Sequence, residues 1–563
     1  MVSKERFTPV FFEVMKNYSL VLFKKDLFAG ITVGIVAVPL ALAFAIASGA
    51  TPSQGIFTAV IAGFFISFLG GSRYQIGGPT GAFVIIIYSI IVQHGYDGLL
   101  IATIMAGIIL IFLGIARVGS FIKFIPYPVT TGFTAGIGVV IFSSQIKDFL
   151  GLTYKETTPE FIDKWISIFS NLSTINISSA AIGIGTVVII LIVRKMSTNI
   201  PSHVVAIVIS TAVCFLLGLN AETIGDRFGT INAVFPAFTV PEVTIEKIRA
   251  LFPAAITIAL LAGIESLLSA VVADGMTGSH HKSNTELVGQ GIANILSGFF
   301  GCIPATGAIA RTATNVRAGG ITPLSGMIHA VFLCLFILFF SFLIEIIPMA
   351  ALAGVLLVVS VDMMGIKNMA NLFSSPKSDV IVLLTTFILT IVIDLTAAVQ
   401  VGVVLAALLF MKRMSDVTSM SKMNFDASEK TAHDITDPDA TSNKDIPEGV
   451  EVYEINGPFF FGVADMLINT LEHIGKTPKV FILRMRNVPA IDATGEHALE
   501  NFYNTCKKAG TQLVLSGVNP VPYATLKKMH FIEIIGEENI TNHIDKALIR
   551  TREILKELEE KAG

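Results

Sequence analysis

One short phrase occurs twice in this chain, once in each half. Residues 79–83 read PTGAF and residues 305–309 read ATGAI, and each copy follows a Gly-Phe-Phe triplet and opens an apolar stretch. Matching hydrophobic segments that Gly and Pro interrupt, one per half, indicate the inverted repeat of a membrane transporter. Irregular backbone at membrane depth is tolerated only against protein or a water-filled cavity. We therefore expect the two phrases to face each other inside the protein and to begin two broken helices.

The start of a helix suits an anion. Its first N–H groups have no partner within the helix and carry partial positive charge, so two facing helix starts would bind a negative solute. The hydroxyl groups of the two threonines would add further donors. The predicted anion-binding residues of the two phrases are Thr80, Gly81, Ala82, Thr306, Gly307 and Ala308.

Composition places both phrases in a membrane domain. The chain is 53% hydrophobic and 14% charged, and between residues 27 and 96 the only formal charge is Arg73. Residues 26–413 divide into about 14 apolar segments, seven on each side of the polar stretch near residues 220–249. The broken segments are the third of each half. We predict an all-α polytopic membrane domain with a seven-plus-seven inverted repeat.

Basic residues mark one side of this domain. Residues 1–25 contain five lysines and arginines, Arg194 and Lys195 follow the sixth segment, and Lys412 and Arg413 follow the last. Because basic flanks stay on the cytoplasmic side, we expect both termini in the cytoplasm, beneath a bacterial-type inner membrane. The first 25 residues then form a cytoplasmic N-terminal segment and not a cleaved signal.

The chain changes character after the last apolar segment. Residues 414–447 are rich in Ser, Asp, Thr, Asn and Lys and form a predicted linker. Residues 448–563 have the pattern of a small soluble α/β domain. The predicted strands are 450–455, 480–485, 512–516 and 531–535, and the predicted helices are 465–473, 495–508, 523–529 and 542–561.

Glu265 is the strongest candidate for coupling transport to an ion. It lies in residues 251–273, an otherwise apolar segment, where a carboxylate costs about 2.5–3.5 kcal/mol on insertion scales. Burial favours the neutral form, so this side chain could take up and release a proton. A hydrogen-bonding role between helices is the alternative.

Arg311 and Phe44 are candidates for the walls of the site. Arg311 follows Gly307 by four residues, so its guanidinium could add positive charge to the second helix start. It could instead snorkel toward the membrane surface or pair with Glu265. Phe44 follows Pro39 in the first segment and could line the site, although packing explains most phenylalanines.

The chain resembles the SulP family of anion permeases, solute-carrier family 26, over nearly its whole length. The stretches that carry the resemblance are GGPTGAF at 77–83, AGIESLL at 262–268, TELVGQG at 285–291, AIARTATNVR at 308–317 and IKDFLGL at 146–152. The amino-acid sequence, including the last of these stretches, is especially similar to bacterial C4-dicarboxylate carriers of that family. The resemblance implies core and gate domains, an elevator movement of the core and usually a homodimer.

The resemblance also implies roles for single residues. Glu265 matches an acidic position of the eighth span that binds the coupling proton or sodium, and Arg311 matches the anion-facing arginine of the tenth span. Phe44 matches an aromatic wall of the first span. Leu40 stands where many sulfate carriers have Gln, which favours a dicarboxylate over sulfate.

The soluble tail resembles a STAS domain. Residues 492–495, DATG, match its signature turn, and Thr494 falls where soluble relatives are phosphorylated, so Asp492 and Thr494 are candidate regulatory residues. A capping turn in front of the helix at 495–508 is the alternative. A cytoplasmic protein or a nucleotide is the expected kind of partner for this domain.

Together these features predict a secondary active transporter, not an enzyme, that imports an anion with a proton. The expected substrates, in order, are a C4-dicarboxylate, sulfate, and bicarbonate with sodium. An uncoupled exchanger or channel, and a sensor that signals through the tail, are the alternatives. Beyond the anion and the lipid bilayer we expect no cofactor, metal or nucleic acid, and the four cysteines lack metal or disulfide spacing.

Overall fold

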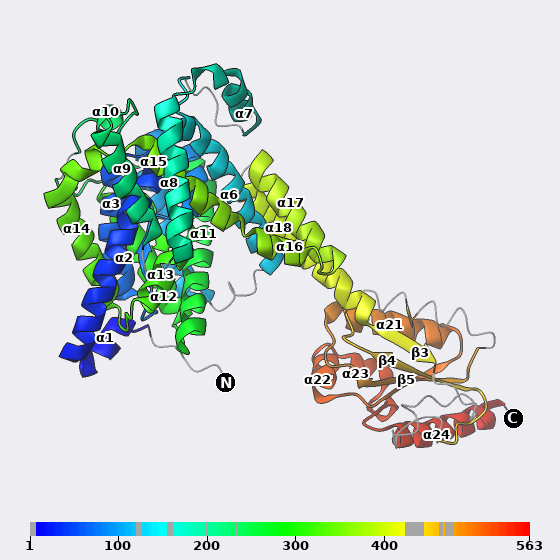
Figure 1. The fold of residues 1–563 in the computed structure, drawn as a ribbon. Helices are drawn as coiled ribbons and strands as arrows, with labels where there is room; N and C mark the ends of the chain where they lie inside the picture. Colours follow the sequence, from blue (N-terminus) through cyan, green and yellow to red (C-terminus); the bar gives the residue numbers. More distant parts are fainter. Residues whose placement is uncertain are drawn as a thin grey trace. The chain divides into compact units, whose positions relative to one another are not determined.

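The fold is described from a computed structural model. It describes residues 7–119, 126–154, 161–196, 201–231, 234–393, 395–422, 444–460, 466–467 and 477–562. The chain forms two compact units, a membrane unit, Met1–Val404, and a smaller unit, Leu405–Gly563 (Figure 1).

The first half of the membrane unit contains seven helical segments. Gly95, with φ of 71°, kinks the long helix α4, so that this one helix supplies two of the seven segments. Thr51 begins α3 with a capping box in which Gln54 is the partner. The helices are α2 Leu20–Ala47, α3 Pro52–Leu69, α4 Val84–Ile115, α6 Tyr127–Leu150, α8 Ile177–Met196 and α9 Ser202–Leu216.

The second half repeats this series. Its helices are α11 Ile245–Thr277, α12 Ser283–Phe299, α13 Ile309–Arg317, α14 Leu324–Glu345, α15 Met349–Met364, α17 Lys377–Val392 and α18 Leu395–Val417. Short helices connect or precede these segments, namely α1 Val10–Val14, α7 Phe161–Ser170, α10 Ile224–Phe228 and α16 Ile366–Leu372. Seven segments in each half agree with the predicted repeat.

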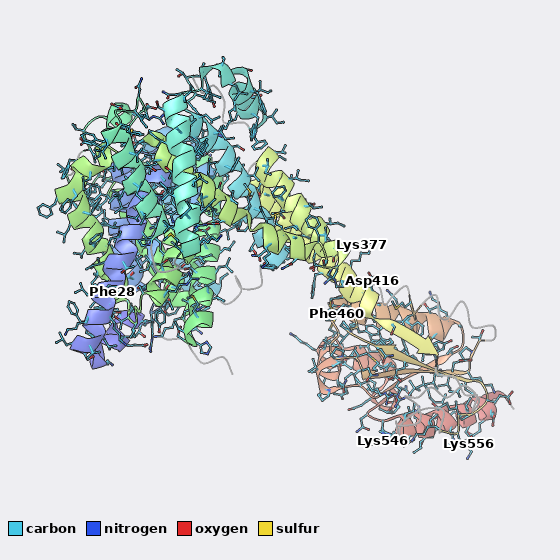
Figure 2. The ribbon with its side chains drawn as sticks, viewed as in Figure 1. Phe28, Lys377, Asp416, Phe460, Lys546 and Lys556 are labelled. Carbon is cyan, nitrogen blue, oxygen red and sulfur yellow. The ribbon has the colours of Figure 1, made fainter. Side chains whose placement is uncertain are left out.

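Apolar side chains cover the outside of this unit. Phe28 of α2, labelled in Figure 2, is 68% exposed, and many other large apolar side chains are similarly exposed. Within the described residues, nine helical stretches are long and apolar enough by themselves to cross a membrane. The exposed apolar surface is therefore the surface that faces lipid.

The helices of the membrane unit form two bundles. In the core bundle, α4 packs against α11 and α12, and α14 packs against α2 and α3. In the gate bundle, α6 packs against α15 and α17, and α8 packs against α9 and α15. Each bundle takes helices from both halves of the chain, so the two halves interlock.

Glycines let the two halves of the core bundle approach closely. Gly107 of α4 and Gly291 of α12 face each other, and a Cβ at either position would lie 2.5 Å from the carbonyl oxygen of the other. Any larger residue would push these helices apart. The close contact fixes the position of α12 next to the first repeat.

The smaller unit is a five-stranded sheet with helices on both faces. The strand order is β3-β4-β5-β6-β7, and all neighbours are parallel except β3 and β4. Phe481 of β5 faces a core with α21 to α23, while Ile482 faces a second core with α24. The strands are β3 Ser419–Lys422, β4 Val450–Asn456, β5 Val480–Asn487, β6 Gln512–Ser516 and β7 Ile540–Thr541. The helices are α21 Ala493–Lys508, α22 Pro520–Lys528, α23 Phe531–Ile535 and α24 Ile544–Ala562.

Three predicted strands are confirmed, and the fourth is wrong. Residues 531–535 form the helix α23, in which Phe531, Ile532 and Ile535 are buried and Glu533 is exposed. This spacing fits one face of a helix, and the fourth parallel strand is instead the short β7. Strand β3 lies inside the stretch predicted as a linker. Most of the helix predicted at 465–473 lies outside the described residues.

Gly291→Ala should destabilise the membrane unit. The added Cβ would lie 2.5 Å from the Gly107 carbonyl oxygen, and overpacking of this kind costs about 1–3 kcal/mol. Gly275→Ala in α11 is the matched control, because no described atom lies within 4 Å of a Cβ there and Ala stabilises a helix by up to about 1 kcal/mol. Heating in detergent followed by size-exclusion chromatography should give a lower Tm for Gly291→Ala only. Equal Tm values for the two variants would contradict the close contact.

Candidate anion-binding site

The two repeated phrases lie side by side. Strand β1, Gly77–Gly78, pairs antiparallel with β2, Thr306–Gly307, and the Ala308 amide donates to the Ile76 carbonyl at 2.8 Å. Antiparallel pairing is what two inverted repeats produce where their third segments meet. These bonds satisfy backbone groups that the broken helices leave open. The expectation that the phrases face each other and interrupt two helices is confirmed.

Each phrase leads directly into a helix. The first enters the 3-10 turn η2, Gly81–Phe83, and then α4, and the second enters α13 at Ile309; neither start has a side-chain cap. No described residue accepts a hydrogen bond from the amides of Gly81 and Ala82, or from those of Ile309 and Ala310. Open amides at a helix start are the donors that an anion takes.

Two of the predicted groups hold the site together. The Thr306 hydroxyl donates to the Ala262 carbonyl at 2.7 Å, and the Ala308 amide belongs to the pairing of β1 with β2. These bonds fix the second phrase to α11 and to the first phrase. The Ile309 and Ala310 amides, which sequence reasoning missed, are the donors that lie one and two residues further along.

Glu265 lies at the first helix start. The Thr80 hydroxyl donates to its carboxylate at 2.8 Å, and the contact joins α11 to the first phrase across 185 residues of sequence. The Glu265 side chain is only partly buried. The structure thus brings the predicted coupling residue and the predicted anion-binding phrase into direct contact.

Arg311 reaches from the second helix back to the first phrase. One guanidinium nitrogen donates to the Pro79 carbonyl at 2.6 Å, and the residue is 2% exposed. A second guanidinium nitrogen is buried without a partner among the described residues and lies against Gly78, where a Cβ would collide with it. The described residues show no ion pair between Arg311 and Glu265. The Arg311 charge therefore lies between the two phrases.

Phe44 and Met363 lie close to the first helix start. A Cβ at Gly81 would lie 3.2 Å from the Phe44 ring and 2.8 Å from the Met363 sulfur. Phe44 is therefore placed where the sequence predicted a wall. Met363 was missed, because a methionine in an apolar helix carries no signal of its own. It belongs to α15 of the gate bundle, whereas the other site residues belong to the core bundle.

A buried carboxylate holds together the segments that pack against the site. Glu286, near the start of α12, is fully buried and accepts four hydrogen bonds of 2.8–3.1 Å. The donors are the amides of Gly71 and Ser72 and the side chains of Ser266 and Gln290. The Ser266 hydroxyl accepts in turn from Gln75, whose side chain fills the space beside Gly307. Sequence reasoning missed this role, although a carboxylate in an apolar segment is the same signal that singled out Glu265.

In the smaller unit, Asp492 caps a helix. Its carboxylate accepts from the Gly495 amide at 2.8 Å at the start of α21, so the capping interpretation is confirmed. Thr494 is exposed in the first turn of that helix. Its position leaves the hydroxyl accessible, and a regulatory role for either residue stays a prediction.

Comparison with known proteins identifies the family. Residues 23–386 match the sulfate permease family and residues 441–547 match the STAS domain. The chain belongs to the sulfate permease family. It is 43% identical over 533 residues to a Bacillus subtilis (strain 168) protein provisionally named sulfate transporter YvdB, covering 94% of this chain and 98% of that protein. It is 31% identical over 546 residues to the bicarbonate transporter BicA of Picosynechococcus, covering 94% of each.

Solved structures agree with the fold. Murine solute carrier 26 family member A9 in its inward-facing state has a TM-score of 0.85 at 19% identity, covering 96% of this chain and 93% of that one. The transmembrane domain of a cyanobacterial BicA has a TM-score of 0.62 at 32% identity, covering 68% and 98%. This chain is a multi-pass secondary anion transporter with a STAS domain, and not an enzyme. Because YvdB and BicA are named for sulfate and bicarbonate, the expected closer likeness to C4-dicarboxylate carriers is not supported.

Glu286→Ala should unfold the core bundle at a lower temperature. Each buried donor left without an acceptor costs about 1–3 kcal/mol, so loss of a carboxylate that serves four donors should cost about 3 kcal/mol or more. Glu242→Ala, at an exposed position before α11, is the control and should change the free energy of unfolding by less than about 0.5 kcal/mol. Thermal loss of the soluble detergent complex measures both. A Glu286→Ala protein as stable as the control would rule out the supporting role.

Proposed function

We propose that this chain imports a divalent oxyanion together with a proton. Sulfate or a C4-dicarboxylate would lie between the open amides of the two helix starts, beside Arg311. The observation that carries the proposal is the 2.8 Å contact of Thr80 with Glu265, because a protonatable carboxylate would then lie at the edge of the proposed anion site. Coupling needs a proton site and an anion site in which the occupancy of one changes the affinity of the other.

A single hydrogen links these two sites. The Thr80 hydroxyl has one hydrogen, and it points at the Glu265 carboxylate. When Glu265 takes up a proton, its own O–H can donate to the Thr80 oxygen. The Thr80 hydrogen is then released to donate to an anion at the helix start. Protonation of Glu265 therefore adds a donor to the anion site.

The charge of the site favours a divalent anion in the protonated state. Two helix starts contribute roughly half a positive charge each, and Arg311 adds one, for a sum of about two. An ionised Glu265 reduces this sum to about one, and a protonated Glu265 restores it. A dianion therefore matches the protonated site, whereas a monovalent anion such as bicarbonate matches the ionised one.

Movement of the core bundle against the gate bundle would carry the anion across the membrane. Phe44, Glu265 and Arg311 lie on α2, α11 and α13, and Thr80 directly precedes η2 and α4. Helix α13 packs against α11 and α2, so all four residues belong to the core bundle and the site can move as one body. The first helix start contacts the gate bundle through Met363 of α15 and through α6, which packs against η2. An elevator movement needs few contacts of this kind, and a methionine side chain adapts easily to a sliding surface.

The names of the relatives affect the order of candidate substrates. Because one relative is provisionally named a sulfate transporter and covers nearly the whole chain, we place sulfate before a C4-dicarboxylate. Bicarbonate with sodium is the second candidate function, because BicA is similar over the same length. An uncoupled exchanger or channel needs no protonatable group at this place, and Glu265 would then only connect α11 to the first phrase through Thr80.

We also propose the arrangement in the membrane. The basic ends of α8 and α18, which carry Arg194 and Lys412, would lie in the cytoplasm together with α1 and the STAS domain. Figure 1 shows α7 and α10 at the end of the membrane unit opposite α1, so these two helices would lie outside. The protein would be a homodimer in an inner membrane, with a cytoplasmic protein or a nucleotide bound at the STAS domain.

Glu265→Gln should abolish accumulation driven by a pH gradient. The amide cannot exchange a proton, but it can still donate to Thr80, so exchange of labelled for unlabelled anion without a gradient should persist. Uptake of labelled sulfate, succinate and bicarbonate into proteoliposomes, with imposed pH or sodium gradients, measures both activities. Proton-driven accumulation by Glu265→Gln would refute the coupling role. Sodium-driven bicarbonate uptake by the unaltered protein would favour the second candidate function.

Arg311→Ala should weaken anion binding. Loss of a charged partner is worth about 1.5–3 kcal/mol, so the apparent Kd or KM should rise by roughly 10- to 150-fold. Arg311→Lys keeps the charge but not the geometry of the hydrogen bond to Pro79, so its apparent Kd or KM should lie between those of the unaltered protein and Arg311→Ala. Arg317→Ala, at the exposed end of α13, is the matched control. An unchanged affinity in Arg311→Ala would remove this residue from the site.

A further inference from the structure

Helix α14 carries a buried polar side chain that no described contact explains. His329 is fully buried, and neither of its ring nitrogens has a partner among the described residues. Helix α14 packs against α2 and α3, so the ring lies inside the core bundle and not against lipid. Buried polar groups are nearly always hydrogen-bonded, so a pair of open ring nitrogens indicates a ligand.

Arg311 brings a second open group to the same region. Its Nη2 donates to the Pro79 carbonyl at 2.6 Å, whereas its Nη1 is buried without an acceptor in the described part of the chain. The Arg311 charge is close enough to act on the His329 ring. Two open groups, one on α13 and one on α14, therefore lie near each other beside β1.

Helix α3 gives the spacing of the two groups. A Cβ at Gly78 would collide with Arg311 Nη1 and would lie 3.4 Å from the Ala59 side chain. A Cβ at Gly63 would lie 3.8 Å from the His329 ring. Ala59 and Gly63 are four residues apart on one face of α3, and one turn of a helix rises about 5.4 Å. The guanidinium and the imidazole are therefore about one turn of α3 apart.

A single water fits this spacing. Two hydrogen bonds of about 2.9 Å that meet at one oxygen span about 5–6 Å. An imidazole that is fully buried without a counter-charge stays neutral and has one N–H donor and one acceptor nitrogen. Water accepts from Arg311 Nη1, and it can also accept from the His329 ring or donate to it. It therefore satisfies both groups in either tautomer, whereas a halide ion can only accept.

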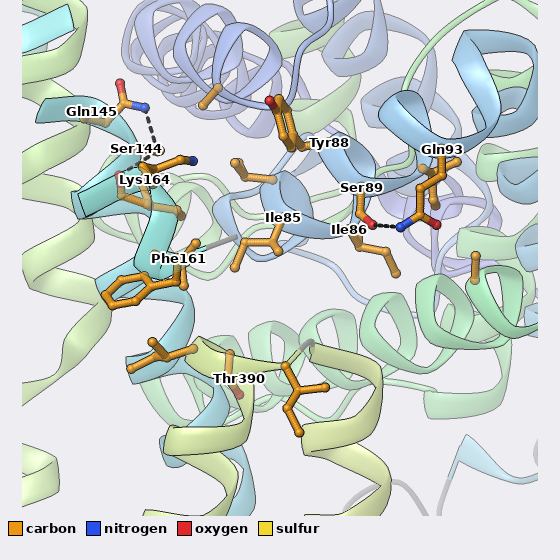
Figure 3. A pocket seen from close by; sticks show the side chains of 18 of the residues that line it. Ile85, Ile86, Tyr88, Ser89, Gln93, Ser144, Gln145, Phe161, Lys164 and Thr390 are labelled. Carbon is orange, nitrogen blue, oxygen red and sulfur yellow. Dashed lines mark hydrogen bonds between the residues drawn. The ribbon is translucent and has the colours of Figure 1, made fainter. Parts of the chain in front are cut away.

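The region between the two groups is separate from the cavity at the first helix start. That cavity has a volume of about 680 Å³, and Val84, which directly follows η2, lines it. Figure 3 shows Ser89 of α4 and Ser144 of α6 on opposite walls. The lining contains no described residue of α3, α13 or α14. A water beside Arg311 would therefore stay with the core bundle when that bundle moves.

We propose that one water lies between Arg311 and His329, and that His329 is, through this water, a positioning residue for the guanidinium. The inference rests on the anion role of Arg311 in the proposed function and adds the group that holds Arg311 in place. Nη2 is fixed to the first phrase at Pro79, and the water fixes Nη1 toward α14. A guanidinium has five N–H donors, so these two bonds leave others that can point at an anion.

The alternative is that the ring only fills space between α3 and α14. Leucine is of similar size and has no polar atom, so His329→Leu keeps most of the packing and removes the hydrogen bond. Asparagine and glutamine place an amide near the Nδ1 and the Nε2 position of the ring, respectively, so one of these two variants should keep the water. Leu333→Ala, also fully buried and one turn further along α14, is the control for lost packing alone.

The test measures anion uptake by the full chain in proteoliposomes, together with Tm in detergent. The labelled anion is sulfate, or succinate or bicarbonate if the unaltered protein accumulates one of these instead. His329→Leu should raise KM about 5- to 10-fold and keep Vmax within about twofold, because a water-mediated bond to a charged group is lost. Either His329→Asn or His329→Gln should keep the original KM. Leu333→Ala should lower Tm and leave KM unchanged, because it opens a cavity away from the guanidinium.

Two results of the uptake measurements would overturn the positioning role. An unchanged KM in His329→Leu is the first. An equal rise of KM in the leucine, asparagine and glutamine variants is the second, because shape and not hydrogen bonding is then responsible.

A density map of the unaltered protein, at a resolution that shows ordered water, tests the site even if the variants do not fold. A peak within hydrogen-bond distance of Arg311 Nη1 and of a His329 ring nitrogen would support the inference. An empty position, or a peak that appears only with chloride in the buffer, would overturn it. No uptake of any of the three anions would overturn the proposed function instead, and the map would still decide whether the water is present.

Discussion

Backbone hydrogen bonds between β1 and β2 allow two helices to break inside a membrane domain. Unpaired backbone groups at that depth cost several kcal/mol each, so a break is stable only where another segment supplies partners. The two phrases supply them to each other across more than two hundred residues of sequence. Glycine at 77, 78 and 307 leaves room for the side chains of Ile66, Arg311 and Gln75, which pack against the pair. The open amides of both helix starts exist in one place because of this pairing.

Helix α11 holds the paired phrases in position through one of its faces. Ala262 accepts from Thr306, Glu265 accepts from Thr80, and Ser269 donates to Thr312 at 3.0 Å. Positions 262, 265 or 266, and 269 lie on one side of a helix. The same helix therefore contacts the first phrase, the second phrase and the helix that follows it. A proton on Glu265 acts on a part of the core that already connects both repeats.

The sequence predicted the features of the fold and of the site that depend on local residue patterns. It missed the features that depend on contacts between residues far apart in the chain. The repeated motif (PTGAF and ATGAI) and a carboxylate in an apolar segment were sufficient to predict two facing broken helices and Glu265 beside them. Met363 lies far away in sequence, in an ordinary apolar helix, so only the folded chain brings it to Gly81. Residues 531–535 were predicted as a strand because four of the five are large and apolar. Such a short run does not distinguish a strand from one turn of a buried helix.

The contact of Thr80 with Glu265 has a thermodynamic consequence under the proposed mechanism. If protonation of Glu265 releases the Thr80 hydrogen to the anion, then a bound anion must favour protonation of Glu265 by the same factor. One charge-assisted hydrogen bond is worth about 1.5–3 kcal/mol, which corresponds to a factor of roughly 10 to 150 in each affinity. The empty site with a proton and the loaded site without one are then both disfavoured. Coupling thus arises from one shared hydroxyl hydrogen and needs no conformational signal between distant sites.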